Sequence, residues 1–260
     1  MDFDTIARSL AGVPHIVPDR AHVLYDFVLN EKPARILELG FAHGVSTCYM
    51  AAALDEIGAG HITTIDIPDA LNRKPDLHQL LEKTGLGKYV TPIIDPTSYT
   101  WTLMEMIQEA TSAGRCEPGY DFVFVDGAHS WDVDGFAFFL AEKLLKPGGW
   151  FLFDDMYWSY DEDLADNPAV GTMTPRDRNT PQIDRVFHLL ATQHPNLDEF
   201  RTQGNWGWAR KRPDATAPKR ESVIDALYRQ QGIGIDIRSI VHKFRKRITI
   251  GKHSTLSKGR

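Results

Sequence analysis

Three aspartates and one histidine have the residue types and the spacing for chemistry at a shared site. Asp126 ends the apolar run 122–125, and Asp154 and Asp155 end the next apolar run along the chain. His129 comes three residues after Asp126 and can project from the same loop. Carboxylate oxygens suit Mg²⁺, and an imidazole with an ordinary pKa of about 6.5 suits proton transfer near neutral pH. This pattern predicts Asp126, Asp154 and Asp155 as metal ligands and His129 as a general base.

The elements that must position these residues alternate between apolar runs and helical patterns. The apolar runs are continuous, which is typical of strands buried on both faces of a parallel sheet. In such sheets ligands bind beyond the carboxyl ends of the strands, so the four residues should gather at one edge. The pattern predicts a doubly wound, mostly parallel α/β fold of the Rossmann-like kind. Strands are expected at 35–40, 61–66, 89–95, 122–125 and 150–153, with a closing hairpin at 198–202 and 206–210.

The remaining segments are predicted with less regular structure. Helices are expected within 4–31 and at 45–57, 76–85, 101–113, 126–145 and 181–193. Lys146-Pro147-Gly148-Gly149 is expected to separate a helix from the following strand. The polar, proline-containing segment 159–180 is predicted as a long loop over the sheet edge, and loops of that length are usually functional or disordered.

Composition bounds the class of protein. The 260-residue chain is 42% hydrophobic and 25% charged, which is ordinary for a globular protein. Two cysteines are too few for a disulfide framework, and the acidic N-terminus does not resemble a signal peptide. We expect a reducing, cytoplasmic location. Residues 1–212 hold 18 basic and 31 acidic residues, so nucleic acid is not an expected partner.

The charge reverses toward the C-terminus. Residues 213–260 hold 11 basic and 4 acidic residues, and 213–218 reads as a linker. We therefore predict a catalytic domain at 1–212 and a linker with a basic amphipathic helical tail at 213–260. Such a tail can pack on its own domain, contact another subunit in a homo-oligomer, or lie peripherally on a membrane, and the sequence leaves these open.

A glycine turn after the first predicted strand indicates a cofactor loop. Gly40 and Gly44 allow backbone N–H groups to approach a ligand closely. Their spacing differs from the dinucleotide fingerprint, which disfavours a hydride-transfer enzyme. Three acids end the first three strands: Glu38, Asp66 and Asp95. A ligand with an ammonium group, a ribose and an adenine would satisfy them, with Asp66 on the ribose hydroxyls.

These motifs together resemble the class I S-adenosylmethionine-dependent methyltransferases. The resemblance is carried by ELGxxxGxS, the acid Asp66, YDFVFVDG and LLKPGGWFLFDD, and covers about residues 20–211. It implies a seven-stranded sheet with an antiparallel last strand. It also implies that Glu38, Gly40, Gly44 and Ser46 surround the methionine end of the cofactor, with Asp95 near the adenine and Asp126 beside the sulfonium.

The DGxH…DD spacing resembles a narrower group, the metal-dependent sugar O-methyltransferases and the cephalosporin-hydroxylase-like proteins. That resemblance implies Mg²⁺ at Asp126, Asp154 and Asp155, a base at His129, and a sugar or glycoside as the small-molecule or glycan acceptor. Asp154 stands where some relatives have glutamate, which shortens one metal-binding arm.

Aromatic residues beside the acids are candidates for acceptor contacts. Trp131, Tyr157 and Trp158 could stack on a sugar or an aromatic ring, or serve as ordinary packing. A catechol-type acceptor chelates a metal as a sugar diol does, and it is the main alternative. A non-catalytic, cofactor-binding protein on the same fold is the second alternative.

Overall fold

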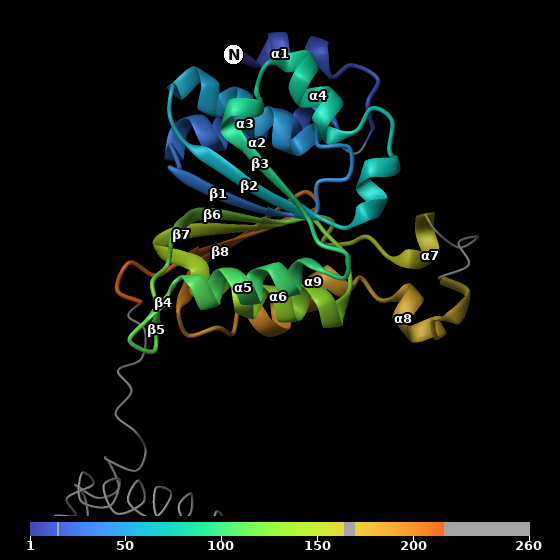
Figure 1. The fold of residues 1–260 in the computed structure, drawn as a ribbon. Helices are drawn as coiled ribbons and strands as arrows, with labels where there is room; N and C mark the ends of the chain where they lie inside the picture. Colours follow the sequence, from blue (N-terminus) through green and yellow to red (C-terminus); the bar gives the residue numbers. More distant parts are fainter. Residues whose placement is uncertain (15, 164–169, 216–260) are drawn as a thin grey trace, which may run out of the picture. The chain divides into compact units, whose positions relative to one another are not determined.

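The computed structural model describes residues 1–14, 16–163 and 170–215, and Met1–Ala215 form one compact unit (Figure 1). The helices are α1 (Phe3–Ser9), α2 (Pro18–Glu31), α3 (Val45–Ile57), α4 (Leu77–Thr84), α5 (Tyr99–Glu109), α6 (Trp131–Leu144), α7 (Tyr160–Asp163), α8 (Pro175–Asn179) and α9 (Gln182–Val186), which a π-helical turn (Phe187–Ala191) extends. The strands are β1 (Arg35–Leu39), β2 (His61–Asp66), β3 (Val90–Ile94), β4 (Thr111–Ser112), β5 (Arg115–Cys116), β6 (Tyr120–Val125), β7 (Leu145–Phe153), β8 (Leu197–Gln203) and β9 (Trp206–Lys211). Short 3-10 turns lie at Pro68–Asn72, Gly87–Tyr89 and Val170–Thr172.

Seven strands form one mixed sheet in the order β3-β2-β1-β6-β7-β9-β8. Neighbours among β3, β2, β1, β6 and β7 are parallel, whereas β9 is antiparallel to both β7 and β8. The predicted fold class is confirmed, including the closing hairpin whose last strand runs antiparallel.

Both faces of the sheet are covered by helices. Helices α1 to α4 lie over one face, and α5, α6 and α9 lie over the other (Figure 1). Successive residues of β6 divide between the two sides: Phe122 and Phe124 pack in the core with α2 and α3, whereas Val123 and Val125 pack with α5 and α6. A strand with a core on each side has no polar face, which explains its continuous apolar sequence.

The region after α5 differs from the prediction of one helix over 101–113. Helix α5 ends at Glu109, and β4 and β5 then form a two-residue antiparallel ladder. The turn between them places Ala113 at φ 51° and Gly114 at φ 78°. Two consecutive positive φ values match the tight hairpin turn and not a helix, so the turn preference prevailed over the helical pattern.

The KPGG segment does not separate α6 from the next strand as predicted. Strand β7 already begins at Leu145, which pairs with Tyr120. The register shifts before Phe122 meets Trp150, and Gly148 has φ 82°. Residues 146–149 therefore form a bulge within the strand, which glycine accommodates because it lacks a Cβ.

The predicted loop at 159–180 contains short helices in its described parts. Helix α8 begins with Pro175 in the first turn, and the Thr174 side chain accepts a hydrogen bond from the N–H of Asp177. Proline at the start and a hydroxyl cap are both helix-initiation signals. The prediction overlooked them because prolines were interpreted as breaks.

A buried ion pair fixes the end of β9 to the end of α6. The Lys211 ammonium lies 2.9 Å from Oε1 of Glu142 and donates to the carbonyls of Glu142 and Leu145. Both side chains are buried, and Asn196 donates to the same carboxylate at 3.0 Å. The two charges are therefore well paired.

Replacing Lys211 with methionine is expected to reduce the free energy of unfolding by about 3–5 kcal/mol, because Glu142 is left buried without its cation. Urea denaturation followed by circular dichroism measures this. The exposed neighbour Lys143→Met is the control and should change little. Adding Glu142→Gln to Lys211→Met should recover part of the loss. A Lys211→Met protein as stable as wild type would contradict the assignment.

The predicted basic helical tail lies, from residue 216 onward, outside the described residues. Cys48 and Cys116 are free thiols. Within the part of the chain that the structure describes, no helix has the length and apolar character needed to cross a bilayer.

Candidate active site

The carboxyl ends of β1, β6 and β7 bring the candidate residues to one edge of the sheet. The N–H of Asp126 donates to the carbonyl of Leu39 at 2.9 Å, and the N–H of Asp154 donates to the carbonyl of Val125 at 3.0 Å. Each acid thus continues the sheet ladder by one residue and then leaves it. The expected gathering of these residues follows directly from the parallel register.

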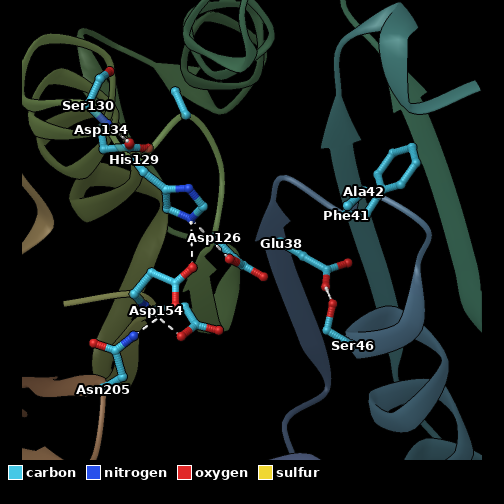
Figure 2. A network of polar contacts seen from close by, with 12 residues as sticks. Glu38, Phe41, Ala42, Ser46, Asp126, His129, Ser130, Asp134, Asp154 and Asn205 are labelled. Atoms are coloured by element: carbon cyan, nitrogen blue, oxygen red, sulfur yellow. Dashed lines mark hydrogen bonds and ion pairs between the residues drawn. The ribbon is translucent and has the colours of Figure 1, made fainter. Parts of the chain in front are cut away.

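Asp126, His129 and Asp155 form a close group at this edge. Nε2 of His129 lies 3.3 Å from Oδ1 of Asp126 and 3.6 Å from Oδ2 of Asp155. One ligand atom from each residue falls within 4.8 Å of the others. In Figure 2 the imidazole points toward the Asp126 carboxylate. His129 and Asp155 adopt φ values of 52° and 53°, a costly conformation that is concentrated at functional sites.

The charges of this group are coupled. Burial alone would lower the pKa of His129, but the hydrogen bond that it donates to Asp126 and the charges of Asp126, Asp155 and Asp134 raise it to about 9. Burial raises the pKa of Asp126. At neutral pH the imidazole is therefore protonated and serves as a counter-ion for the carboxylates.

Asp154 is placed differently from its predicted partners. It is 5% exposed, and its Oδ1 lies 3.3 Å from Nη1 of Arg20, which is also 3.7 Å from Oδ1 of Asp155. Burial and the charges of Asp126 and Asp155 raise its pKa well above the usual range. The close donor group thus contains His129 where the sequence predicted Asp154, and Arg20 on α2 supplies a counter-charge that no sequence motif indicated.

Asn205 is a second residue that the sequence did not single out. Its side-chain N–H donates to Oδ1 of Asp155 at 2.8 Å, and its own Oδ1 accepts the N–H of Tyr157 at 2.7 Å. Asn205 lies in the turn between β8 and β9 and was interpreted only as a turn residue. It orients Asp155 from the antiparallel hairpin, and Figure 2 shows the Asn205 side chain near the acids.

The glycine loop lies against the loop of the acids. Gly40 has φ 84°, and a Cβ built there would lie 2.2 Å from the carbonyl oxygen of Asp126. Gly44 has φ 90° and precedes α3, where a Cβ would lie 2.3 Å from Leu77 Cδ1. Both positions have a positive φ that favours glycine, and a side chain at Gly40 would also collide with the backbone of Asp126, whereas one at Gly44 would meet Leu77 of α4. The loop and the acids thus form one continuous surface.

Glu38 lies beneath this loop and not at its surface. The side chain is fully buried, and its oxygens accept hydrogen bonds from Ser46 at 2.6 Å, Thr47 at 2.5 Å and Thr64 at 2.6 Å. Figure 2 shows the Glu38–Ser46 pair. The residue predicted to face the methionine end therefore organises the first turn of α3 from below, and Ser46 is its donor.

Burial raises the pKa of Glu38 to about 7, although the three hydroxyl donors favour the charged form. The folded state therefore binds a proton more tightly than the unfolded state, whose value is near 4.5. The stability from this proton is present below pH 4.5 and is lost as the pH rises through about 7.

Replacing Glu38 with glutamine is therefore expected to flatten this pH dependence. Between pH 5 and pH 8 the wild type should lose about 2–3 kcal/mol more unfolding free energy than Glu38→Gln. Urea denaturation at both pH values checks this, with Glu82→Gln on exposed α4 as the control. Parallel curves for wild type and Glu38→Gln would show that the carboxylate does not titrate in this range.

Asp66 and Asp95 both bind backbone groups. Oδ2 of Asp66 accepts the N–H groups of Phe41 and Ala42, each at 2.8 Å, so this acid ties β2 to the glycine loop. Oδ1 of Asp95 accepts the N–H groups of residues 97 and 98, and its Oδ2 accepts the hydroxyl of Thr102. Burial opposes the charge of Asp95, but these hydrogen bonds outweigh it and lower the pKa. Asp95 is thus a turn residue that also holds the Thr102 side chain of α5, whose N-cap is Ser98.

The predicted aromatic residues separate in space. Trp158 lies beside the acid cluster, with its ring centroid 5.2 Å from that of His129. Tyr157 is 51% exposed. Trp131 lines a separate groove of about 290 Å³ with Arg176, Arg185 and others, between α6 and the α8–α9 segment. Trp158 is therefore the aromatic residue of the three whose ring lies beside that of His129.

The donor set is chemically suitable for a divalent cation. Two carboxylates and an imidazole within 4.8 Å match the oxygen and nitrogen ligands of Mg²⁺ or Mn²⁺. Burial and the neighbouring acids raise the pKa values of Asp126 and Asp154, and a bound cation would stabilise their charged forms.

Comparison with known proteins agrees with the fold and the loop. A family model described as a methyltransferase domain matches residues 37–156, which include β1, the glycine loop, β6 and the acids. Comparison with curated proteins gives no significant match. The family-model match and the sheet order together show a Rossmann-like methyltransferase fold.

Solved structures share the fold at low identity. The O-methyltransferase TomG from Streptomyces achromogenes, involved in tomaymycin synthesis and in complex with SAM, is 19% identical with a TM-score of 0.55, over 81% of this chain and 89% of that one. An O-methyltransferase from Bacillus cereus in complex with SAH is 20% identical with a TM-score of 0.55, over 80% and 88%. SAH-bound methyltransferase PaMTH1 from Podospora anserina is 19% identical with a TM-score of 0.56, over 80% and 86%.

Proposed function

We propose that this chain is an O-methyltransferase that transfers the methyl group of S-adenosylmethionine to a hydroxyl of a sugar or glycoside, aided by a divalent cation. The observation that carries the proposal is the contact between the glycine loop and the acid cluster: Gly40 packs on the backbone of Asp126, whose carboxylate faces His129. A methyl donor on the loop and a hydroxyl at the acids would therefore be neighbours.

The reaction that fits this arrangement is an in-line displacement. The acceptor oxygen attacks the methyl carbon, the carbon–sulfur bond breaks, and the products are a methyl ether and S-adenosylhomocysteine. The hydroxyl proton passes to Nε2 of His129, and Asp126 and Asp155 stabilise the resulting imidazolium. When bound, a divalent cation would lower the pKa of a coordinated hydroxyl.

The residues of the site divide these tasks. Asp126 and Asp155 would hold the cation, with Asn205 fixing Asp155 and Arg20 fixing Asp154. A cation among these carboxylates would also oppose protonation of His129, so the imidazole would be neutral and able to act as a base. Asp66 and Ser46 support the donor-binding loop, and Trp158 offers an apolar surface next to the histidine.

The sugar acceptor is supported by the DGxH…DD pattern and by three acids that suit a chelating vicinal diol. An aromatic diol chelates in the same way, so a catechol acceptor is the second candidate, favoured by the partly exposed ring of Trp158 beside His129. The basic tail leaves open a membrane-associated or oligomeric enzyme.

An acceptor panel tests the proposal. The full chain is incubated with S-adenosylmethionine labelled in the methyl group, Mg²⁺, and either methyl glycosides, free deoxysugars or catechols, and labelled product is separated by chromatography. We expect labelled methyl groups in a glycoside product, and we expect this labelling to disappear when the metal is chelated. Label in catechol alone would favour the second candidate. Methyl transfer that is unaffected by exhaustive chelation would contradict the metal.

A further inference from the structure

The loop that carries His129 is held in an unfavourable conformation by residues outside the acid cluster. Residues 127–130 connect β6 to α6, and His129 within them has φ 52°. The left-handed backbone conformation costs free energy for a residue that has a β-carbon, so neighbouring groups must hold the loop in place. Three side chains that have no role in the proposed chemistry make the contacts that do so.

The first contacts come from a buried tyrosine–aspartate pair. Asp134, in the first turn of α6, is 0% exposed. Its carboxylate accepts the hydroxyl of Tyr99 from α5 and the N–H of Ser130 at 2.8 Å. The Tyr99 oxygen in turn accepts the N–H of Ala128 at 3.1 Å. The N–H groups on both sides of His129 thus end on one buried pair.

The same tyrosine fixes the loop by packing. A Cβ built on Gly127 would lie 2.5 Å from Cε1 of Tyr99, so the loop backbone rests directly on the ring. This contact requires glycine at 127 and explains the glycine of the DGxH pattern independently of any ligand.

A second tyrosine holds the loop from another element. The hydroxyl of Tyr160, at the start of α7, donates to the carbonyl of Ala128. Its ring centroid lies 4.8 Å from that of Trp158, which contacts His129. Both backbone polar groups of Ala128 are therefore bound by tyrosine hydroxyls from different elements, α5 and α7.

We propose that Tyr99, Asp134 and Tyr160 are positioning residues that fix the backbone on either side of His129 and so direct its Nε2 toward Asp126 and Asp155. This inference rests on the proposed function, in which His129 takes the acceptor proton. Sub-ångström placement of such a group is worth up to about 100-fold in rate, so a loosened loop should lower turnover without weakening donor binding.

Substitutions can separate positioning from packing. Asp134→Asn retains the volume, but the Tyr99 hydroxyl and the Ser130 N–H bind different oxygens of Asp134, so replacing one oxygen with NH₂ removes the acceptor of one of them. Tyr99→Phe keeps the ring against Gly127 but removes the hydroxyl oxygen that accepts the Ala128 N–H. Tyr160→Phe removes only the hydroxyl that donates to Ala128, and Tyr160 is partly exposed. This variant should therefore fold even if Tyr99→Phe and Asp134→Asn do not.

The test combines amide hydrogen exchange with kinetics on the full chain. Exchange is resolved for the peptide that covers residues 126–132, and kcat and KM for S-adenosylmethionine are measured with the acceptor that the panel identifies. The matched control is Asp132→Asn, exposed in the same helical turn as Asp134.

In Tyr99→Phe and Asp134→Asn we expect exchange of this peptide to accelerate by about tenfold or more, with exchange in β1 and β2 unchanged. The kcat should fall by about 10- to 100-fold while KM for S-adenosylmethionine stays within about twofold. Tyr160→Phe should show both effects in smaller measure.

Two results would overturn the inference. One is unchanged exchange and unchanged kcat in all three variants. The other is faster exchange across the whole sheet, including in Tyr160→Phe, which would show general destabilisation. Hydrogen exchange does not depend on any reaction. If loop exchange accelerates in the variants while the wild type methylates no acceptor of the panel, the positioning role of Tyr99, Asp134 and Tyr160 is upheld and the proposed function is rejected.

Discussion

Replacing His129 with alanine is expected to lower the turnover of methyl transfer by about 10²–10⁴-fold, the range of a general base in a positioned site. The imidazole is the titratable nitrogen group at the cluster, and its Nε2 lies 3.3 Å from Asp126 and 3.6 Å from Asp155. The substitution removes the imidazole that receives the acceptor proton in the proposed mechanism. Steady-state kinetics with the identified acceptor measures the loss.

The same variant also separates a base from a metal ligand, because His129 belongs to the close donor group. If His129 acts as the base, Mn²⁺ affinity measured by calorimetry should change by less than about tenfold while turnover collapses. Loss of both would assign the imidazole to the metal, since the removal of a ligand weakens binding by at least about 10- to 100-fold. His78→Ala, on the exposed face of α4, is the control. A near-wild-type rate in His129→Ala would contradict either role.

Replacing Asp126 with asparagine is expected to abolish divalent-cation binding and to lower turnover by at least about 10³-fold. The Asp126 carboxylate faces His129, and the Asp126 backbone contacts the glycine loop. Asp126 therefore lies where the two parts of the proposed site meet. Loss of its charge removes a hard oxygen ligand and the acid that stabilises the imidazolium. Calorimetric titration of Mn²⁺ and steady-state kinetics measure the two effects.

Asp69→Asn, an exposed acid in the 3-10 turn after β2, is the matched control and should bind Mn²⁺ as wild type does. Chelation of the wild type should reproduce the activity loss of Asp126→Asn, and added Mg²⁺ should restore the wild type but not the variant. Full activity of Asp126→Asn with retained metal binding would place the cation elsewhere.

The sheet and its edge were predictable because their causes are local or follow from simple geometry. Continuous apolar runs such as 122–125 have few other solutions than a strand buried on both faces, and parallel strands bring their terminal acids together. The glycine loop was predictable for the same reason, since Gly40 and Gly44 need positive φ values that few residues tolerate.

The errors arose where short-range signals competed or where contacts came from distant elements. The tight turn at Ala113-Gly114 prevailed over a helical pattern, and the bulge at 146–149 was interpreted as a break. Arg20 and Asn205 reach the acids from α2 and from the β8–β9 turn. Arg20 is 134 residues from Asp154 in the sequence, and Asn205 is 50 residues from Asp155. A local sequence motif therefore could not predict these contacts.

The roles of individual acids were the least predictable part. Glu38 and Asp95 have the residue type and position of ligand-binding acids, yet their oxygens are occupied by hydroxyl and backbone donors of the protein. Sequence gives the strand end at which an acid stands, whereas the direction of its carboxylate depends on which donors pack around it. Asp134 escaped notice because an acid in a first helical turn is commonplace, and only burial distinguishes it.

The central claim is that the glycine loop and the acid cluster form one site, and a crystal structure with S-adenosylhomocysteine and Mn²⁺ tests it most directly. The account predicts the cofactor over residues 40–44, with its sulfur directed toward Asp126, and an anomalous difference peak from Mn²⁺ beside the carboxylates of Asp126 and Asp155. Cofactor bound on this loop with no Mn²⁺ at those carboxylates would contradict the metal-assisted site, and cofactor bound elsewhere would contradict the account as a whole.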